Sequence, residues 1–107
     1  MAAYLVVEND WKTVPLETRQ AFGRVAQPAI HSHGGRFITG RFVEPVEGGW
    51  APSIVTIIEF PDLEQARALL AAPEFREAVA IRQATDAEFR SVLVEGVDVE
   101  AQDFRSV

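Results

Sequence analysis

The chain has 107 residues, of which 48% are hydrophobic and 24% are charged, and its formal net charge is −6. This size and composition are typical of one globular domain. The chain contains no cysteine, which excludes disulfide bonds, thiolate nucleophiles and cysteine-ligated zinc. The acidic balance and the lack of a basic stripe argue against a nucleic-acid partner, because phosphate neutralisation dominates that affinity.

The apolar segments are short. None approaches the roughly 18 residues of a membrane-spanning helix, and the apolar start of the chain is too short for a signal peptide. We therefore expect no membrane association and a cytoplasmic protein.

Hydrophobic periodicity in the first half of the chain predicts a strand, a helix and a second strand. Residues 4–7 (Tyr-Leu-Val-Val) read as a short buried strand. A helical stripe with apolar spacings of three and four runs from about residue 15 to His33. Gly34 and Gly35 then supply a turn in which positive φ is accessible. The alternating residues 36–43 predict the second strand.

The second half predicts a loop, two strands and two short helices. The loop at 44–52 holds two prolines, two glycines and Trp50. Asp62 with Gln65 resembles a capping box, and Pro73 suits the first turn of a helix. The remaining elements are strands at 53–60 and 89–97 and helices at about 63–70 and 73–82. Residues 98–107 are interpreted as a C-terminal tail or an added edge strand.

This order predicts an α+β fold of the ferredoxin-like type, βαββαβ, over residues 1–97. Right-handed crossovers then give a four-stranded antiparallel sheet in the order 4-1-3-2, with the helices on one face. Both faces of the strand at 53–60 are apolar, and helices on one side cover only one of them. The predicted solution is a homodimer that closes two sheets into an α/β barrel.

Several short motifs, in their order and spacing, resemble one known family. They are Ala3-Tyr4-Leu5-Val6-Val7, Pro28-Ala29-Ile30, His33-Gly34-Gly35-Arg36-Phe37, Glu47-Gly48 with Trp50 and Pro52, Ile58-Glu59-Phe60-Pro61, Ala72-Pro73-Glu74-Phe75, Ile81-Arg82-Gln83 and Leu93-Val94-Glu95-Gly96-Val97. Over roughly residues 2–97 the chain is similar to the bacterial proteins of the domain of unknown function 1330. The resemblance implies membership of the dimeric α/β-barrel superfamily, which includes cofactor-free monooxygenases, muconolactone-type isomerases and haem-degrading enzymes.

The chain departs from the pattern of those relatives. Such proteins often carry a basic residue where this chain has Ser53-Ile54, a tyrosine where Phe75 stands and a serine where Asp62 stands. A different ligand or activity is therefore compatible with the resemblance.

The predicted topology brings chemically useful side chains to one end of the sheet. Counting outward from a hairpin centred near Glu47-Gly48 pairs Arg36 with Glu59, and the end also receives Tyr4, His33 and Glu95. In one interpretation His33 is a general base, Glu59 its orienting partner and Arg36 an anion clamp. In the other, Arg36 and Glu59 form an ordinary cross-strand ion pair and His33 only ends a helix.

The opposite end of the sheet collects aromatic and cationic residues, namely Asn9, Trp11, Arg41, Trp50 and Arg90. Such a rim suits an anionic or aromatic ligand, with Trp50 as a ligand-binding lid. It also suits a dimer contact, because Trp and Arg are enriched in interfaces.

No metal or cofactor site is predicted. His31 and His33 lie two residues apart, which puts them on opposite faces of a helix, and the glycine pairs lack the flanks of a phosphate loop. The sequence therefore predicts a homodimer that binds a small polar-aromatic or carboxylated molecule, as a cofactor-free enzyme of the isomerase or monooxygenase kind. The alternative is a non-catalytic dimeric accessory or regulatory module.

Overall fold

The computed structural model describes residues 1–97, and the predicted tail at 98–107 lies outside the described residues. The elements are β1 (Ala3–Asn9), α1 (Leu16–Ser32), β2 (Arg36–Phe37), β3 (Ile54–Phe60), α2 (Leu63–Ala71), α3 (Pro73–Gln83) and β4 (Phe89–Glu95). The predicted βαββαβ order is confirmed, with the second crossover divided into two helices.

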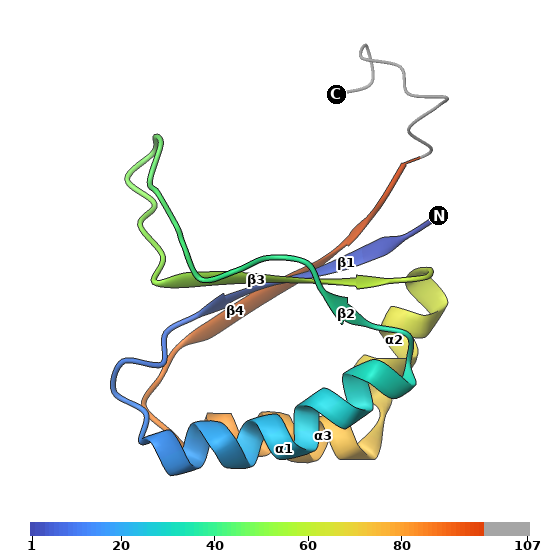
Figure 1. The fold of residues 1–107 in the computed structure, drawn as a ribbon, viewed down its shortest axis with the longest axis horizontal. Coiled ribbons are helices and arrows are strands. Elements are labelled where there is room, and N and C mark those ends of the chain that lie inside the picture. Colours follow the sequence, from blue (N-terminus) through green and yellow to red (C-terminus); the bar gives the residue numbers. More distant parts are fainter. Residues whose placement is uncertain (98–107) are drawn as a thin grey trace.

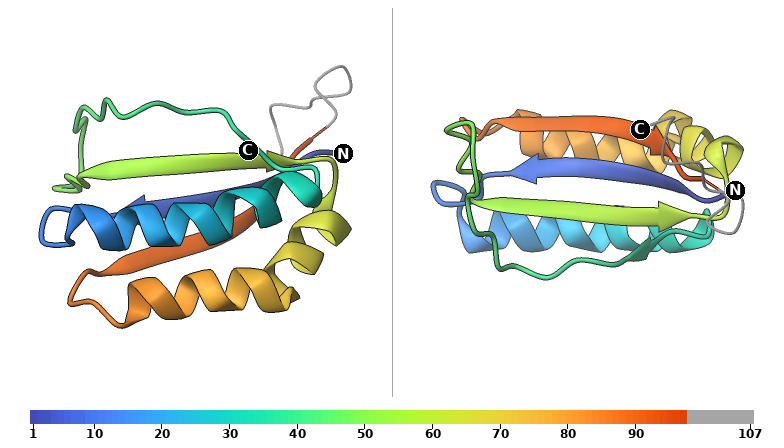
Figure 2. Two further views of the ribbon diagram at one scale, coloured as in Figure 1. Left: turned by 60° about the horizontal axis from the view of Figure 1, so that its bottom comes forward. Right: turned by 90° about the horizontal axis from the view of Figure 1, so that it is seen from above.

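The four strands form one sheet in the order β2-β3-β1-β4, and every neighbouring pair is antiparallel. This is the predicted order read from the other edge. The three helices form a layer on one side of the sheet, and within residues 1–97 the opposite side carries no helix (Figures 1 and 2). The α+β, ferredoxin-like class predicted from the sequence is confirmed.

The strands alternate between the two faces of the sheet, as their period of two requires. In β1 the residues Ala3, Leu5, Val7 and Asn9 are buried toward the helices. The intervening side chains, from Tyr4 to Glu8, point to the other face. We call these the inner face and the outer face.

The second strand is much shorter than predicted. The sequence predicts residues 36–43, whereas only Arg36 and Phe37 pair with β3 as a strand. Ile38 still donates its N–H to the Ile57 carbonyl at 3.0 Å. At the next position the Thr39 hydroxyl takes over from the backbone, accepting from the Ile57 N–H at 2.9 Å and donating to the Val55 carbonyl at 3.2 Å. The chain from 38 to 53 then leaves the sheet as an arm that rises on the outer side (Figure 1).

The turns that join the elements follow from their local chemistry. Gly34 has φ +77°, and Gly35 donates its N–H to the Ile30 carbonyl at 2.9 Å, which ends α1. The Asp62 carboxylate accepts the Gln65 N–H at 2.8 Å and caps α2, as predicted. Pro73 opens α3, where its missing N–H costs no helical hydrogen bond.

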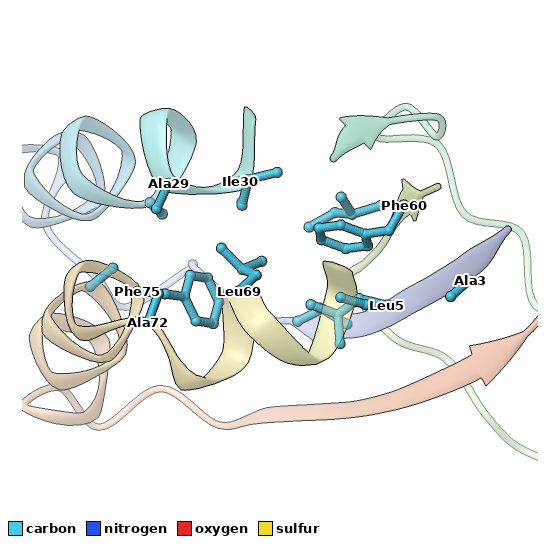
Figure 3. Packing of buried hydrophobic residues seen from close by; sticks show 13 residues of the cluster. Ala3, Leu5, Ala29, Ile30, Phe60, Leu69, Ala72 and Phe75 are labelled. Carbon is cyan, nitrogen blue, oxygen red and sulfur yellow. The ribbon is translucent and has the colours of Figure 1, made fainter. Parts of the chain in front are cut away.

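The core lies between the inner face of the sheet and the helix layer (Figure 3). Phe60 and Leu69 are its largest fully buried side chains. The helices contribute many small residues, which lets them approach the sheet closely; these include Ala26, Ala29, Ala66, Ala72 and Ala78. Within residues 1–97, no helix has the length and apolar character needed to cross a membrane.

Candidate functional site

The residues predicted at the first end of the sheet are divided between its two faces. Arg36 pairs with Glu59 across β2 and β3, as the sequence predicts, with the guanidinium 2.6 Å from the carboxylate. Tyr4 is opposite Glu59 on β1, so all three lie on the outer face. The Arg36–Glu59 ion pair is exposed, with the Arg36 side chain 73% accessible. Exposed ion pairs contribute about 0–1 kcal/mol to the stability of the fold.

His33 and Glu95 belong to the helix side. His33 is the C-terminal cap of α1, and its Nδ1 lies 2.8 Å from the Ala29 carbonyl. Because a carbonyl only accepts, Nδ1 is the donor in this hydrogen bond. Glu95 pairs with Ala3, an inner-face residue, whereas its neighbour Val94 pairs with Tyr4. No hydrogen bond within residues 1–97 joins His33 to Glu59.

Trp50 is held at the opposite end, on the outer face. Its indole Nε1 donates to Glu8 Oε1 at 2.9 Å, and Arg90 Nε donates to Glu8 Oε2 at 2.6 Å. The hydrogen bond from Arg90, followed by that from Trp50, lowers the pKa of Glu8 below its ordinary value. The same carboxylate raises the pKa of Arg90. Trp50 thus fastens the arm to the sheet.

The structure contains a cavity that the predicted cluster does not include. It has a volume of about 550 Å³ and lies between the inner face of the sheet and the helices α1 and α3. This volume is within the range of about 300–1,000 Å³ that is usual for small-molecule sites. Its walls are largely apolar, with contributions from Leu5, Val7, Phe22, Ile30, Ile58 and Phe75. Gly23 of α1 and Gly40 of the arm leave room at its border.

One wall of the cavity is polar. Asn9, the last residue of β1, is 7% exposed and donates from Nδ2 to the Thr56 hydroxyl at 2.7 Å. Both side chains line the cavity. Arg19 from α1 and Arg41 from the arm line it as well, and Arg19 Nε donates to the Val14 carbonyl at 3.1 Å. These groups place hydrogen-bond donors around an otherwise apolar space.

Arg82 of α3 has the least ordinary environment among these groups. Its guanidinium carbon lies 4.7 Å from the ring centre of Phe89 and 5.6 Å from that of Phe22. Its Nε is buried and has no hydrogen-bond partner within residues 1–97. Burial lowers the pKa of Arg82 from its ordinary value. Trp11 completes the aromatic surroundings, with its ring centre 4.8 Å from that of Phe89 and 5.3 Å from that of Phe22.

The ring contacts of Arg82 stabilise it, whereas the burial of its Nε without a hydrogen bond destabilises it. Cation–π contacts contribute about 0.5–2 kcal/mol. A buried donor without a partner costs about 1–3 kcal/mol, and more when it is charged. A group kept in such a position on the border of a cavity is a candidate for ligand recognition.

Sequence reasoning identified part of this site. Asn9, Trp11 and Arg41 were expected at this end of the sheet, but with Trp50 and Arg90, which lie on the other face. Arg82 lies within the predicted helix at 73–82 but is not among the predicted site residues. Its spacing from Phe75 and Ala78 places a cation on an otherwise apolar stripe, and this is the signal that could have found it.

The outer face of the sheet is the second feature available for recognition. By strand register it carries an apolar band formed by Val6, Ile38, Val55, Ile57, Val92 and Val94. Val92 is 59% exposed. The pair Arg36–Glu59 lies at one end of this band, and the pair Arg90–Glu8 lies at the other.

The family model of the domain of unknown function DUF1330 matches residues 2–97. No curated protein matches the chain. Similar solved structures include the RPA0582 protein of unknown function from Rhodopseudomonas palustris, which is 21% identical with a TM-score of 0.67. That match covers 91% of this chain and 83% of the other.

Two further structures share the fold at similar identity. A dimeric ferredoxin-like protein of unknown function from Thermobifida fusca YX is 17% identical, with a TM-score of 0.61 and coverage of 90% of this chain and 92% of that one. A mutant of SnoaB, a cofactor-independent oxygenase from Streptomyces nogalater, is 18% identical, with a TM-score of 0.62 and coverage of 94% and 98%. At these identities the similarity establishes the fold alone.

Proposed function

The chain belongs to the DUF1330 family, and we propose that it is a homodimer in which each protomer binds a small molecule in the cavity between α1, α3 and the sheet. The observation that carries this proposal is the cavity itself, about 550 Å³ with apolar walls and one polar wall. A concave, largely apolar site that is open to solvent and carries a few convergent polar groups is the usual design of a small-molecule site.

The dimer rests on the outer face of the sheet. Its apolar band faces away from the helices, and an isologous two-fold contact would cover the same band on both protomers. The charges at its two ends are already paired, Arg36 with Glu59 and Arg90 with Glu8, so a second copy meets no unpaired charge there. The Thermobifida protein of the same fold is dimeric.

A cofactor-free enzyme is the second candidate function, in the same cavity. Thr56, whose hydroxyl accepts from Asn9 and can donate in turn, and Arg82 would stabilise negative charge that develops on a bound substrate, as preorganised donors do in other enzymes. SnoaB carries out oxygenation without a cofactor on the same fold. The pair His33 and Glu59 is the weaker choice for acid–base chemistry, because the two residues belong to different layers of the protein.

The test is a variant that fills the cavity without disturbing the fold. Gly23 lines the cavity, and among residues 1–97 a Cβ added there would meet only Gln27 Nε2, at 3.9 Å, so Gly23→Leu introduces its side chain without a clash at Cβ. Replacing glycine inside α1 also improves helix propensity by about 0.8–1 kcal/mol. The control is Gln20→Leu, an exposed position of the same helix that does not line the cavity.

Binding is measured by the fluorescence of phenylnaphthylamine, an uncharged aromatic probe, and subunit number by native mass spectrometry. We expect the native protein to be a dimer that binds one probe per protomer. Gly23→Leu should bind the probe at least about tenfold more weakly, and Gln20→Leu should bind it as the native protein does. Equal binding by all three proteins would rule the cavity out as the site. A non-catalytic accessory module, the alternative, predicts a dimer that binds no probe in this cavity.

A further inference from the structure

We propose that the cavity selects aromatic anions, such as aromatic carboxylates, and that Arg82 is the residue that recognises the negative charge. This inference rests on the proposed function, because it names the ligand class of the same cavity. It goes further in assigning a charge to the ligand and a specificity role to one side chain.

The charge of the cavity lining is the first argument. The whole chain contains 16 acidic and 10 basic residues. Yet the residues that line the cavity include three arginines, Arg19, Arg41 and Arg82, and among the described residues no aspartate or glutamate lines it. An acidic protein that surrounds one apolar space with cations alone creates a local positive field, which favours an anion.

The surroundings of Arg82 are the second argument. Within residues 1–97 the ion pairs are Arg36–Glu59 and Arg90–Glu8, so Arg82 has no carboxylate partner there. The rings of Phe22 and Phe89 contact its guanidinium group, and the Arg82 side chain lines the cavity. A guanidinium carries donors in its plane, in a fork that matches a planar anion such as carboxylate.

The aromatic part of the ligand follows from the same walls. The ring of Trp11 packs against those of Phe22 and Phe89, and Phe89 also contacts Arg82. Of these rings, Trp11 and Phe22 line the cavity. Asn9 pairs with Phe89 across β1 and β4, so its amide lies at the same end of the sheet as this aromatic group. Flat rings pack against aromatic walls in offset or edge-to-face geometry. An aromatic ring that bears an anionic group therefore satisfies both parts of the cavity.

The experiment compares two fluorescent probes that differ in charge. Anilinonaphthalene sulfonate is an aromatic anion, and phenylnaphthylamine is the same ring system without the sulfonate. The probes are titrated into the native protein, Arg82→Gln, Arg82→Lys and Arg67→Gln. Arg67 is an exposed residue of α2 that does not line the cavity, so its variant removes the same charge and serves as a control.

We expect Arg82→Gln to weaken binding of the sulfonate by roughly 10–100-fold, the usual effect of losing a charge-assisted hydrogen bond. Binding of phenylnaphthylamine should change by less than about threefold, and Arg67→Gln should change the binding of neither probe. Arg82→Lys keeps the charge and should retain part of the sulfonate affinity. If Arg82→Gln fails to fold, the comparison of the two probes is made with Arg82→Lys instead.

Two results overturn the inference. One is that Arg82→Gln binds the sulfonate as tightly as the native protein. The other is that a variant at Arg82 weakens both probes equally, which assigns the residue to packing. If Gly23→Leu leaves both probes bound, the cavity is not the site and the proposed function fails with it. If Gly23→Leu blocks both probes while Arg82→Gln affects neither, the cavity remains the binding site and only the charge selectivity is wrong.

Discussion

Gly35 occupies a buried position between the end of α1 and the end of β3. A Cβ built there would lie 2.6 Å from Ile30 Cγ2, 2.8 Å from Phe60 Cε1 and 3.0 Å from the Ile30 carbonyl oxygen. These distances are well below van der Waals contact, and the neighbours are a backbone oxygen and two core side chains. The position therefore requires glycine for close approach.

We expect Gly35→Ala to lower the free energy of unfolding by about 1–3 kcal/mol, the usual cost of overpacking a core. Chemical denaturation measures it. Gly40→Ala is the matched control, because a Cβ at Gly40 meets no heavy atom within 4 Å. That variant should change stability by less than about 0.5–1 kcal/mol. Equal losses in the two variants would contradict the steric explanation.

At the scale of single residues, sequence reasoning located side chains along the strands better than it located the site. Counting from the hairpin paired Arg36 with Glu59 correctly, because an antiparallel register moves in equal steps. The same counting did not separate the two faces, so Tyr4 and Glu95 were grouped although they point to opposite sides. Arg82 was missed because only the folded structure reveals a cavity beside it.

At the scale of elements, the strands that contain dense runs of apolar residues were predicted closely. The strand expected at 53–60 is β3, Ile54–Phe60, and the strand expected at 89–97 is β4, Phe89–Glu95. The strand expected at 36–43 ends at Phe37, because the Thr39 hydroxyl bonds to β3 in place of its backbone. A side chain that competes with the backbone ladder is not visible in hydrophobic periodicity.

The arm at 38–53 is held to the outer face through one carboxylate. Glu8 accepts from both Trp50 and Arg90, and these bonds, with Arg90 the larger cause, lower its pKa from the ordinary value of 4.5. A carboxyl group with a depressed pKa stabilises its contacts above the ordinary value, and that contribution is lost as the pH falls through the folded pKa. The attachment of the arm should therefore persist through neutral and mildly acidic pH.

We expect the emission of Trp50, isolated in a Trp11→Phe background, to be constant above about pH 5 and to change with a midpoint below the ordinary glutamate value. Fluorescence titration measures this. Adding Glu8→Gln keeps an acceptor for the indole N–H but removes the titrating group, so this transition should disappear. A transition that survives in the Glu8→Gln protein would assign the change to another group.

At the scale of the whole molecule, the two faces of the sheet have different roles. The inner face supplies the core and the cavity, and both are complete within one protomer. The outer face carries an apolar band that lies beyond the reach of the helix layer (Figure 2). The sequence indicated this division, because β3 is apolar on both faces while the predicted helices cover only one.

A charge placed on the outer band should separate the proposed dimer without unfolding the protomer. Val92 is 59% exposed in the protomer, so Val92→Lys leaves the ammonium group in water in the separated chain but buries it without a partner in the dimer. Burying an unpaired charge costs several kcal/mol, which shifts the dissociation constant by at least about a hundredfold. Size-exclusion chromatography with light scattering should show monomers of Val92→Lys with unchanged circular dichroism.

The control Gln20→Lys, on the exposed side of α1, should remain dimeric. If Val92→Lys is dimeric at micromolar concentration, the two protomers do not meet through this face.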